Sequence, residues 1–317
     1  MKNISLIIFA LFVLPFCSAQ SHTEAIAFGD FENWMERTIE ESAIIGGQTK
    51  TVWAIAPKAH IEGKVIYQAT VSPWGSSNVM AKVIGITKTS NSTFPDRRSD
   101  GQAAKLVSMM ESCKVLGMIN IEVLISGAIY LGTAFEPITS INGPYAKIDM
   151  GMPFSRHPKG IMFDYKTFIS PSGLITRATG MSSIKRYAGD DCPEVFAYLQ
   201  KRTEDKQGNI YAKRIATIRY RFNKNQPSWV NNFSQEFIYG DARESPKYKS
   251  YMNLIQGQNA FNARNSKGKI VAINENEWGD GTETPTHVIL MFVAGYHGAF
   301  VGAEGNILWI DNIKFEY

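Results

Sequence analysis

The chain has 317 residues, of which 44% are hydrophobic, 12% aromatic and 20% charged, and its formal net charge is +4. This composition excludes a disordered, collagen-like or coiled-coil chain, because each of these needs a compositional bias that is absent here. The small positive charge is spread along the chain without a dominant basic patch, so we expect no nucleic-acid partner.

The amino-terminal residues are typical of a secretory signal peptide. A positively charged start is followed by an apolar run over residues 4–16 and a small-residue cleavage site. We therefore predict a signal peptide over residues 1–19, a single mature domain over residues 20–317, and secretion to the periplasm or the outer cell surface. The apolar run is too short to cross a bilayer, so no transmembrane segment is expected. Lipidation at Cys17 is the alternative, which the bulky Phe16 before it disfavours.

Strand patterns dominate the mature chain. Residues 216–222 alternate between apolar and polar side chains, as in a strand with one buried face. Residues 121–125 and 288–293 are short, largely apolar runs typical of buried strands. The pattern predicts an all-β fold, with two packed antiparallel sheets and long loops over residues 89–102, 203–208 and 274–286.

Helical signals are few, and we expect one or two short helices. Ser245 as N-cap, Pro246 at the first position and Gly257 beyond the end predict one of them. The apolar residues of the segment 31–42 fit a helix as well as a strand, so its type stays open.

Two cysteines, Cys113 and Cys192, follow the predicted signal peptide. In an oxidising compartment they can form a disulfide, and otherwise they are two buried, reduced residues. Their separation in the sequence does not decide between these alternatives.

The two ends of the chain carry acidic residues among aromatic ones. Asp311 falls on the apolar face of the last strand, where an ionised carboxylate needs a metal, a basic side chain or several backbone N–H groups, unless a bulge turns it outward. Asp30 and Glu32 lie between aromatic residues near the other end. Since oxygen ligands suit calcium, we predict a structural Ca²⁺ held by Asp30, Glu32 and Asp311.

Five fragments in order carry a resemblance to a known family. They are Phe31-Glu32-Asn33-Trp34, Trp74-Gly75-Ser76-Ser77-Asn78, Gly151-Met152-Pro153-Phe154 with Arg156 and Pro158, Phe163-Asp164-Tyr165-Lys166, and Gly302-Ala303-Glu304-Gly305-Asn306 leading into Asp311-Asn312. Through them the chain resembles the putative carbohydrate metabolism domain family of secreted bacterial proteins. The resemblance implies a jelly-roll sandwich, like that of carbohydrate-binding modules, and a role connected with carbohydrate.

Candidate ligand-binding residues combine flat aromatic rings with hydrogen-bonding groups, as sugar sites do. Trp74 with Asn78, and Tyr165 with Lys166, have this composition, and the family resemblance adds Arg156. We predict that these residues contact an oligo- or polysaccharide.

The sequence leaves three functions open. The first is a secreted glycan-binding protein that needs no catalysis. The second is a glycoside hydrolase, which requires a carboxylate pair, although no spacing singles out a pair such as Asp164 with Glu194 or Asp280 with Glu304. The third is a structural or adhesive protein of the cell envelope. The sequence shows neither a zinc-binding histidine spacing nor a serine-hydrolase motif.

Overall fold

The computed structural model describes residues 22–83, 85–99, 101–115, 119–139, 145–180 and 183–317. The predicted signal peptide therefore lies outside the described residues. Within them, the regular structure consists of strands and of 3-10 helices that are three residues long. No helix of the described residues is long and apolar enough to cross a membrane.

The larger sheet runs in the order β12-β11-β24-β18-β19-β23-β22, and β5, β13 and β21 add to β11, β24 and β19. Its strands are β5 (Trp74–Ser76), β11 (Ala128–Ala134), β12 (Ile148–Met150), β13 (Met152–Pro153), β18 (Glu194–Glu204), β19 (Ile210–Arg221), β21 (Ile238–Tyr239), β22 (Asn262–Arg264), β23 (Ile270–Trp278) and β24 (His287–Val293).

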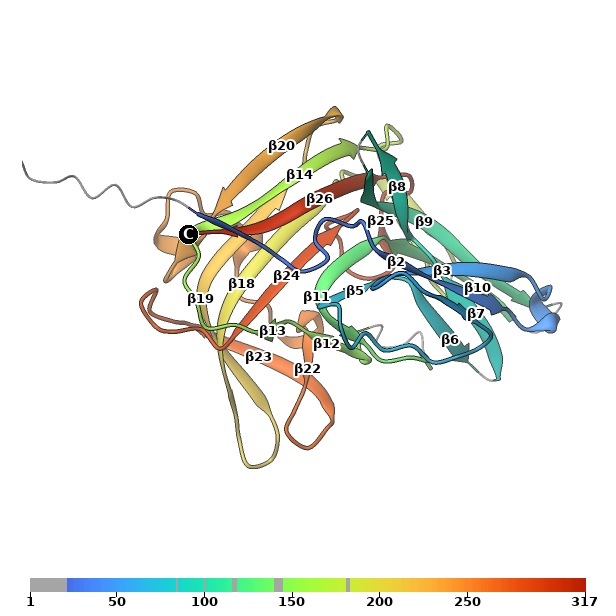
Figure 1. Cartoon of the computed structure of the whole chain (residues 1–317), viewed down its shortest axis with the longest axis horizontal. Coiled ribbons are helices and arrows are strands. Elements are labelled where there is room, and N and C mark those ends of the chain that lie inside the picture. Colours follow the sequence, from blue (N-terminus) through green and yellow to red (C-terminus); the bar gives the residue numbers. More distant parts are fainter. Residues whose placement is uncertain (1–21, 84, 100, 116–118, 140–144, 181–182) are drawn as a thin grey trace, which may run out of the picture.

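The second sheet runs in the order β16-β10-β9-β26-β14-β20, with β1 beside β26 and β8 beside β9. Its strands are β1 (Thr23–Ala25), β8 (Thr93–Arg98), β9 (Gly101–Val115), β10 (Ile119–Ser126), β14 (Gly160–Phe168), β16 (Thr179–Gly180), β20 (Gln226–Glu236) and β26 (Ile307–Glu316). In Figure 1 the layer of β20, β14 and β26 lies over the layer of β19, β18 and β24.

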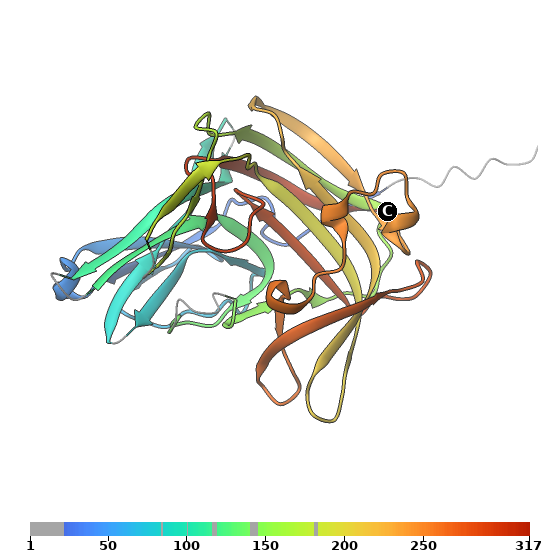
Figure 2. The ribbon, with the colours of Figure 1, turned by 180° about the vertical axis from the view of Figure 1, so that it is seen from behind.

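Three small sheets flank these layers. They contain β2 (Trp34–Glu40), β3 (Thr49–Ile55) and β4 (His60–Glu62); β6 (Val79–Val83) and β7 (Ile86–Ser90); and β15 (Leu174–Arg177), β17 (Lys185–Ala188) and β25 (Val301–Gly302). Figure 2 shows the molecule from behind, with the red segment that contains β25 between the blue-to-green strands and the yellow-to-orange strands.

One apolar core fills the space between the two large sheets. Leu308 and Ile310 of β26 belong to the same buried cluster as Val195 of β18 and Leu290 of β24. This arrangement confirms the predicted all-β fold with two packed sheets, since each sheet buries one face against the other. Most strand pairs are antiparallel, but β23 runs parallel to β19 and β4 runs parallel to β2. The finer jelly-roll assignment stays a prediction.

The expected short helix after Ser245 is wrong. This region forms separate 3-10 turns, which are η2 (Ala242–Glu244), η3 (Ser250–Met252) and η4 (Gly257–Asn259), and a further turn is η1 (Ala43–Ile45). The backbone groups that a helix would use are bound by side chains from neighbouring strands. Arg214 donates to the carbonyl of Met252 at 3.2 Å, and the N–H of Ile255 donates to Glu275 at 2.8 Å. Tertiary hydrogen bonds therefore replace the helical ones.

Two other local patterns are decided by pairing between strands. The segment with ambiguous spacing forms β2, which lies between β3 and β4, so strand pairing overrides its helical periodicity. The expected loop over residues 89–102 contains β8, which pairs with β9 along its whole length.

Both cysteines, Cys113 and Cys192, are free, with Cys113 half-buried and Cys192 buried, so the reduced alternative applies in this structure.

The last strand reverses its buried face in the middle. Leu308 and Ile310 point into the core, and after Asp311 the buried residues become Ile313 and Phe315. Asn312 has a left-handed backbone with φ of 54°, and the pairing of β14 with β26 shifts register at this point. Such a bulge exchanges the two faces of the strand, so Trp309, between Leu308 and Ile310, lies on the face away from the core.

Candidate functional site

Trp74 and Asn78 lie in the interior of the protein. The indole of Trp74 is 2% exposed within the core cluster, and its N–H donates to the carbonyl of Ala27 at 2.9 Å. The amide of Asn78 donates to the carbonyls of Trp53 and Thr93, and it accepts from two backbone N–H groups. Neither side chain is placed to contact a sugar, because one is enclosed by the core and the other has its hydrogen-bonding capacity used.

Tyr165 and Lys166 are consecutive residues of β14 and point to opposite faces of the sheet, as neighbours in a strand do. The ring of Tyr165 packs against Phe222 and Phe233, with centroids 4.7 and 4.9 Å apart. Lys166 lies on the outer face, where its ammonium is 4.2 Å from the ring centre of Trp309. The two residues therefore do not form one site.

Arg156 lies near the two ends of the described chain. Its guanidinium pairs with Glu24 and lies 5.2 Å from the ring centre of Tyr317. The structure thus separates Arg156 from the interior positions of Trp74 and Asn78.

The partner of Asp311 is a basic side chain. Arg98 donates to Asp311 at 2.6 Å and to Asp164 at 2.8 Å, and these two aspartates are each 4% exposed. The carboxylate of Glu32 accepts from the backbone N–H of Gln102 at 2.9 Å. Among the described residues, no group of three or more His, Cys, Asp or Glu side chains is arranged to hold a metal ion.

The calcium ion predicted at Asp30, Glu32 and Asp311 stays a prediction without support from this arrangement. Arg98 already supplies the positive charge that the buried carboxylate of Asp311 requires. Burial raises the pKa of Asp311 to about 6, even though Arg98 opposes this shift. A folded-state pKa above the ordinary 3.8 means that Asp311 contributes less to stability as the pH rises from about 4 through about 6.

Replacing Arg98 by Leu should therefore destabilise the protein by about 3 kcal/mol at neutral pH, because two carboxylates stay buried without a cation. The loss should shrink as the pH falls below about 6, since Asp311 then becomes protonated and needs no counter-charge. Urea unfolding at pH 7 and pH 4.5 measures both effects. In the same assay, EDTA should leave the stability of the unmodified protein unchanged, and a marked drop with EDTA would restore the calcium hypothesis.

A cleft of about 1450 Å³ opens on the outer side of the large sheet. Its lining comes from the β6–β7 hairpin, from β9 and β10, from the outer face of β11, β18, β19 and β24, and from two segments, residues 251–262 and 295–300. This volume exceeds the roughly 300–1,000 Å³ of small-molecule pockets. The cleft therefore has room for a chain of several units.

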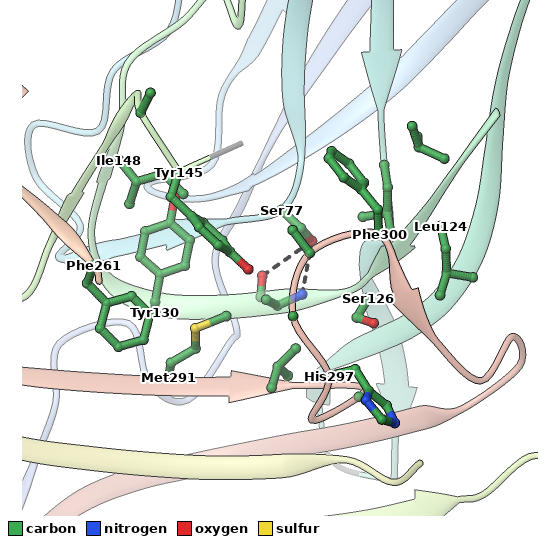
Figure 3. Close-up of a pocket in the computed structure, with 18 of the residues that line it drawn as sticks. Ser77, Leu124, Ser126, Tyr130, Tyr145, Ile148, Phe261, Met291, His297 and Phe300 are labelled. Carbon is green, nitrogen blue, oxygen red and sulfur yellow. Dashed lines mark hydrogen bonds between the residues drawn. The ribbon is translucent and has the colours of Figure 1, made fainter. Parts of the chain in front are cut away.

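Aromatic rings gather at one end of the cleft. Figure 3 shows Tyr130, Tyr145, Phe261 and Met291 close together, with Ser126 and His297 farther along. The ring of Phe261 stacks on that of Phe196 at a centroid distance of 5.5 Å. Stacked rings of this kind offer apolar faces to a ligand.

The hydroxyl of Tyr130 has no hydrogen-bond partner among the described residues, although it is fully buried. Burial raises the pKa of this phenol, so it stays protonated at neutral pH and able to donate. A β-carbon on Gly75 would lie 2.5 Å from the ring of Tyr130, so the ring fits here only because residue 75 has no side chain. An unpaired buried hydroxyl costs free energy, which makes Tyr130 a candidate polar contact for a ligand that reaches it.

A charged cluster lies at the edge of the cleft on β18 and β19. Glu194 is 1% exposed and accepts from Arg219 at 2.8 and 2.9 Å and from Arg221 at 3.0 Å. The guanidinium of Arg221 lies 4.1 and 3.7 Å from the ring centres of Tyr251 and Tyr296. These contacts pair the carboxylate of Glu194 with two guanidinium groups and brace the two segments that line the cleft.

The loop over residues 295–300 is fixed by a buried carboxylate. Asp191 accepts from the N–H groups of Tyr296 and Ala303, each at 2.8 Å. A β-carbon on Gly295 or Gly302 would lie 2.5 or 2.9 Å from this carboxylate, so both glycines allow its close approach. Asp191 therefore positions this wall of the cleft.

The residues that line the cleft were missed at the sequence level. The run Gln256-Gly257-Gln258-Asn259-Ala260-Phe261-Asn262 is rich in amides around one aromatic residue and lies mostly outside strands. That composition is the local signal that could have indicated a polar binding segment. None of the five predicted ligand-binding residues lines the cleft among its described residues.

Two solved structures resemble this chain at a distance. A crystal structure from Bacteroides thetaiotaomicron, described as a putative glycoside hydrolase, is 16% identical with a TM-score of 0.43, over 84% of this chain and 74% of that one. A second, from Bacteroides vulgatus ATCC 8482 and described in the same words, is 12% identical with a TM-score of 0.42, over 92% of this chain and 94% of that one. No curated protein matches the chain. The family model of the Putative carbohydrate metabolism domain matches residues 30–316, and the chain belongs to that family.

Proposed function

We propose that this protein binds an oligosaccharide in the cleft and does not cleave it. Membership of a carbohydrate-metabolism family supports a saccharide ligand. The observation that carries the proposal is the lining of the cleft, where stacked rings at one end adjoin the amide-rich segment 256–262. Rings cover the apolar faces of sugars and amides match their hydroxyls, which is the combination that a sugar site needs.

Binding without cleavage is favoured by the carboxylates of the cleft. Among the described lining residues, Glu111 and Glu194 are the acidic ones. Three guanidinium hydrogen bonds hold Glu194, whose side chain is 2% exposed, so it offers no free oxygen to attack a sugar. Burial raises the pKa of Glu111, which suits a general acid, but a hydrolase needs a second, accessible carboxylate.

Replacing Phe261 by Ala should weaken oligosaccharide binding about tenfold, or about 1.4 kcal/mol, because the stacked ring is lost. A glycan array of neutral oligosaccharides identifies the strongest ligand, and calorimetry then gives the affinity of each variant. The control is Tyr187→Ala, since this exposed tyrosine lies on β17 outside the cleft lining. Equal affinities for the two variants would contradict a site in the cleft.

The hydrolase alternative is tested with the same ligand. We expect the unmodified protein to release no reducing sugar on prolonged incubation. Release that disappears in Glu111→Gln would instead establish glycoside hydrolysis with Glu111 as the acid. Absence of both binding and release would favour the structural or adhesive role. Secretion to the periplasm or the cell surface stays a prediction from the amino-terminal residues.

A further inference from the structure

A row of cations and indole rings crosses the outer face of the second sheet. Lys105 of β9 lies 5.5 Å from the ring centre of Trp309 of β26, and Lys166 of β14 lies 4.2 Å from the same ring. Lys166 is also 5.6 Å from the ring centre of Trp229 of β20, over which the guanidinium of Arg98 lies at 4.3 Å. Four adjacent strands thus alternate positive groups with aromatic rings.

These tryptophans are not part of either large apolar cluster of the described residues. Leu308 and Ile310, the neighbours of Trp309, fill the core, so strand alternation puts the indole on the opposite face. The indole N–H of Trp309 donates to Asp96 at 2.6 Å, which fixes the orientation of the ring. The half-buried rings therefore belong to an outer surface that core packing does not explain.

The lysine between the rings is not neutralised. Lys105 lies 4.0 Å from a carboxylate oxygen of Asp96, whereas Lys166 has no ion-pair partner among the described residues. A depression of about 360 Å³ opens beside it, lined by Thr167, Phe168, Asn225, Pro227, Trp309 and Lys166 itself. The ring of Phe168, 44% exposed, forms part of this lining. A cation therefore faces an accessible hollow with apolar walls.

We propose that this face binds an acidic polysaccharide, with a carboxylate or sulfate of one sugar unit paired to Lys166 in the depression. Strand spacing places β9 and β14 about 9.5 Å apart, so Lys105 and Lys166 can meet successive anionic groups along one chain. The indole and phenyl surfaces take up the apolar faces of the sugar rings between these groups. None of these residues lines the cleft, so this site is separate from the proposed oligosaccharide site in the cleft.

The test uses polygalacturonate, with its fully methyl-esterified form as a neutral chain of the same backbone. Affinity electrophoresis of the whole protein should show retention by the acidic form, little by the ester, and weakening as salt rises. Lys166→Gln should reduce the affinity about tenfold without changing the melting temperature, and Lys166→Arg should keep most of it. The control is Lys185→Gln, which removes the same charge from an exposed position on β17.

Equal loss in Lys166→Gln and Lys185→Gln would overturn the proposal, since net charge alone would then explain retention. Equal retention by the methyl ester, or by single-stranded DNA of similar length, would also overturn it, because the face would not select an acidic saccharide. The variant Phe261→Ala keeps its binding to polygalacturonate if the two sites are independent. The variants Phe261→Ala and Lys166→Gln therefore test the two sites separately. Either the cleft hypothesis or the hypothesis of an acidic-polysaccharide site can fail without the other.

Discussion

Replacing Arg214 by Met should lower the free energy of unfolding by about 3 to 5 kcal/mol, because it leaves Glu275 charged and buried. Arg214 is 0% exposed and Glu275 is 2% exposed, and two hydrogen bonds join them across β19 and β23. The same pair holds the segment 251–262, since Arg214 binds the carbonyl of Met252 and Glu275 binds the N–H of Ile255. Urea unfolding followed by tryptophan fluorescence measures the loss.

Two further variants separate charge burial from packing. The double variant Arg214→Met with Glu275→Leu should recover part of the lost stability, because no charge stays unpaired in the interior. Lys213→Met breaks the neighbouring exposed pair with Glu277 on the same two strands, and it should cost less than about 1 kcal/mol. Similar losses for Arg214→Met and Lys213→Met would show that the buried pair contributes no more to stability than the exposed pair.

Replacing Trp74 by Ala should cost about 3 to 5 kcal/mol of stability, as truncation of a buried aromatic side chain does. The indole is 2% exposed, packs near Phe31 with a centroid distance of 6.0 Å, and donates to the chain at Ala27. Thermal unfolding gives the size of the effect. Trp309→Ala, on the outer face of the sheet, should give a clearly smaller loss.

The milder change Trp74→Phe tests the sequence-based hypothesis that Trp74 contacts a sugar. This variant keeps a ring in the core, so we expect most of the stability and the full oligosaccharide affinity to persist. A tenfold loss of affinity at unchanged melting temperature would instead support the hypothesis that Trp74 contacts the sugar. Calorimetry with the ligand found for the cleft supplies the measurement.

Local patterns succeeded where one face of a strand is buried. The alternation of residues 216–222 predicted the end of β19, where Ala216 and Ile218 enter the core, as does Phe222 just after the strand. Arg219 and Arg221 point away from the core. The alternation breaks at Asp311, because one bulged residue exchanges the two faces of a strand, an alternative that the sequence left open. A residue's face can be predicted only as far as the alternation stays regular.

Candidate sugar-binding residues could not be recognised from their composition alone. An aromatic residue beside an amide describes Trp74 with Asn78 as well as it describes Phe261 with Asn262, yet the first pair is interior and the second lines the cleft. Burial depends on which strands cover a side chain. The strands that enclose Trp74 come from distant parts of the chain.

The sequence by itself determined the all-β character of this protein and its membership of a carbohydrate-related family, because strand periodicity and family motifs are recorded within short segments. Only the tertiary structure decided the partner of Asp311, the burial of Trp74 and the location of the cleft. Arg98 meets Asp311 across 213 positions of sequence, and the cleft joins strands from both halves of the chain. Contacts of this kind are set by how the sheets pack, which no local pattern of residues specifies.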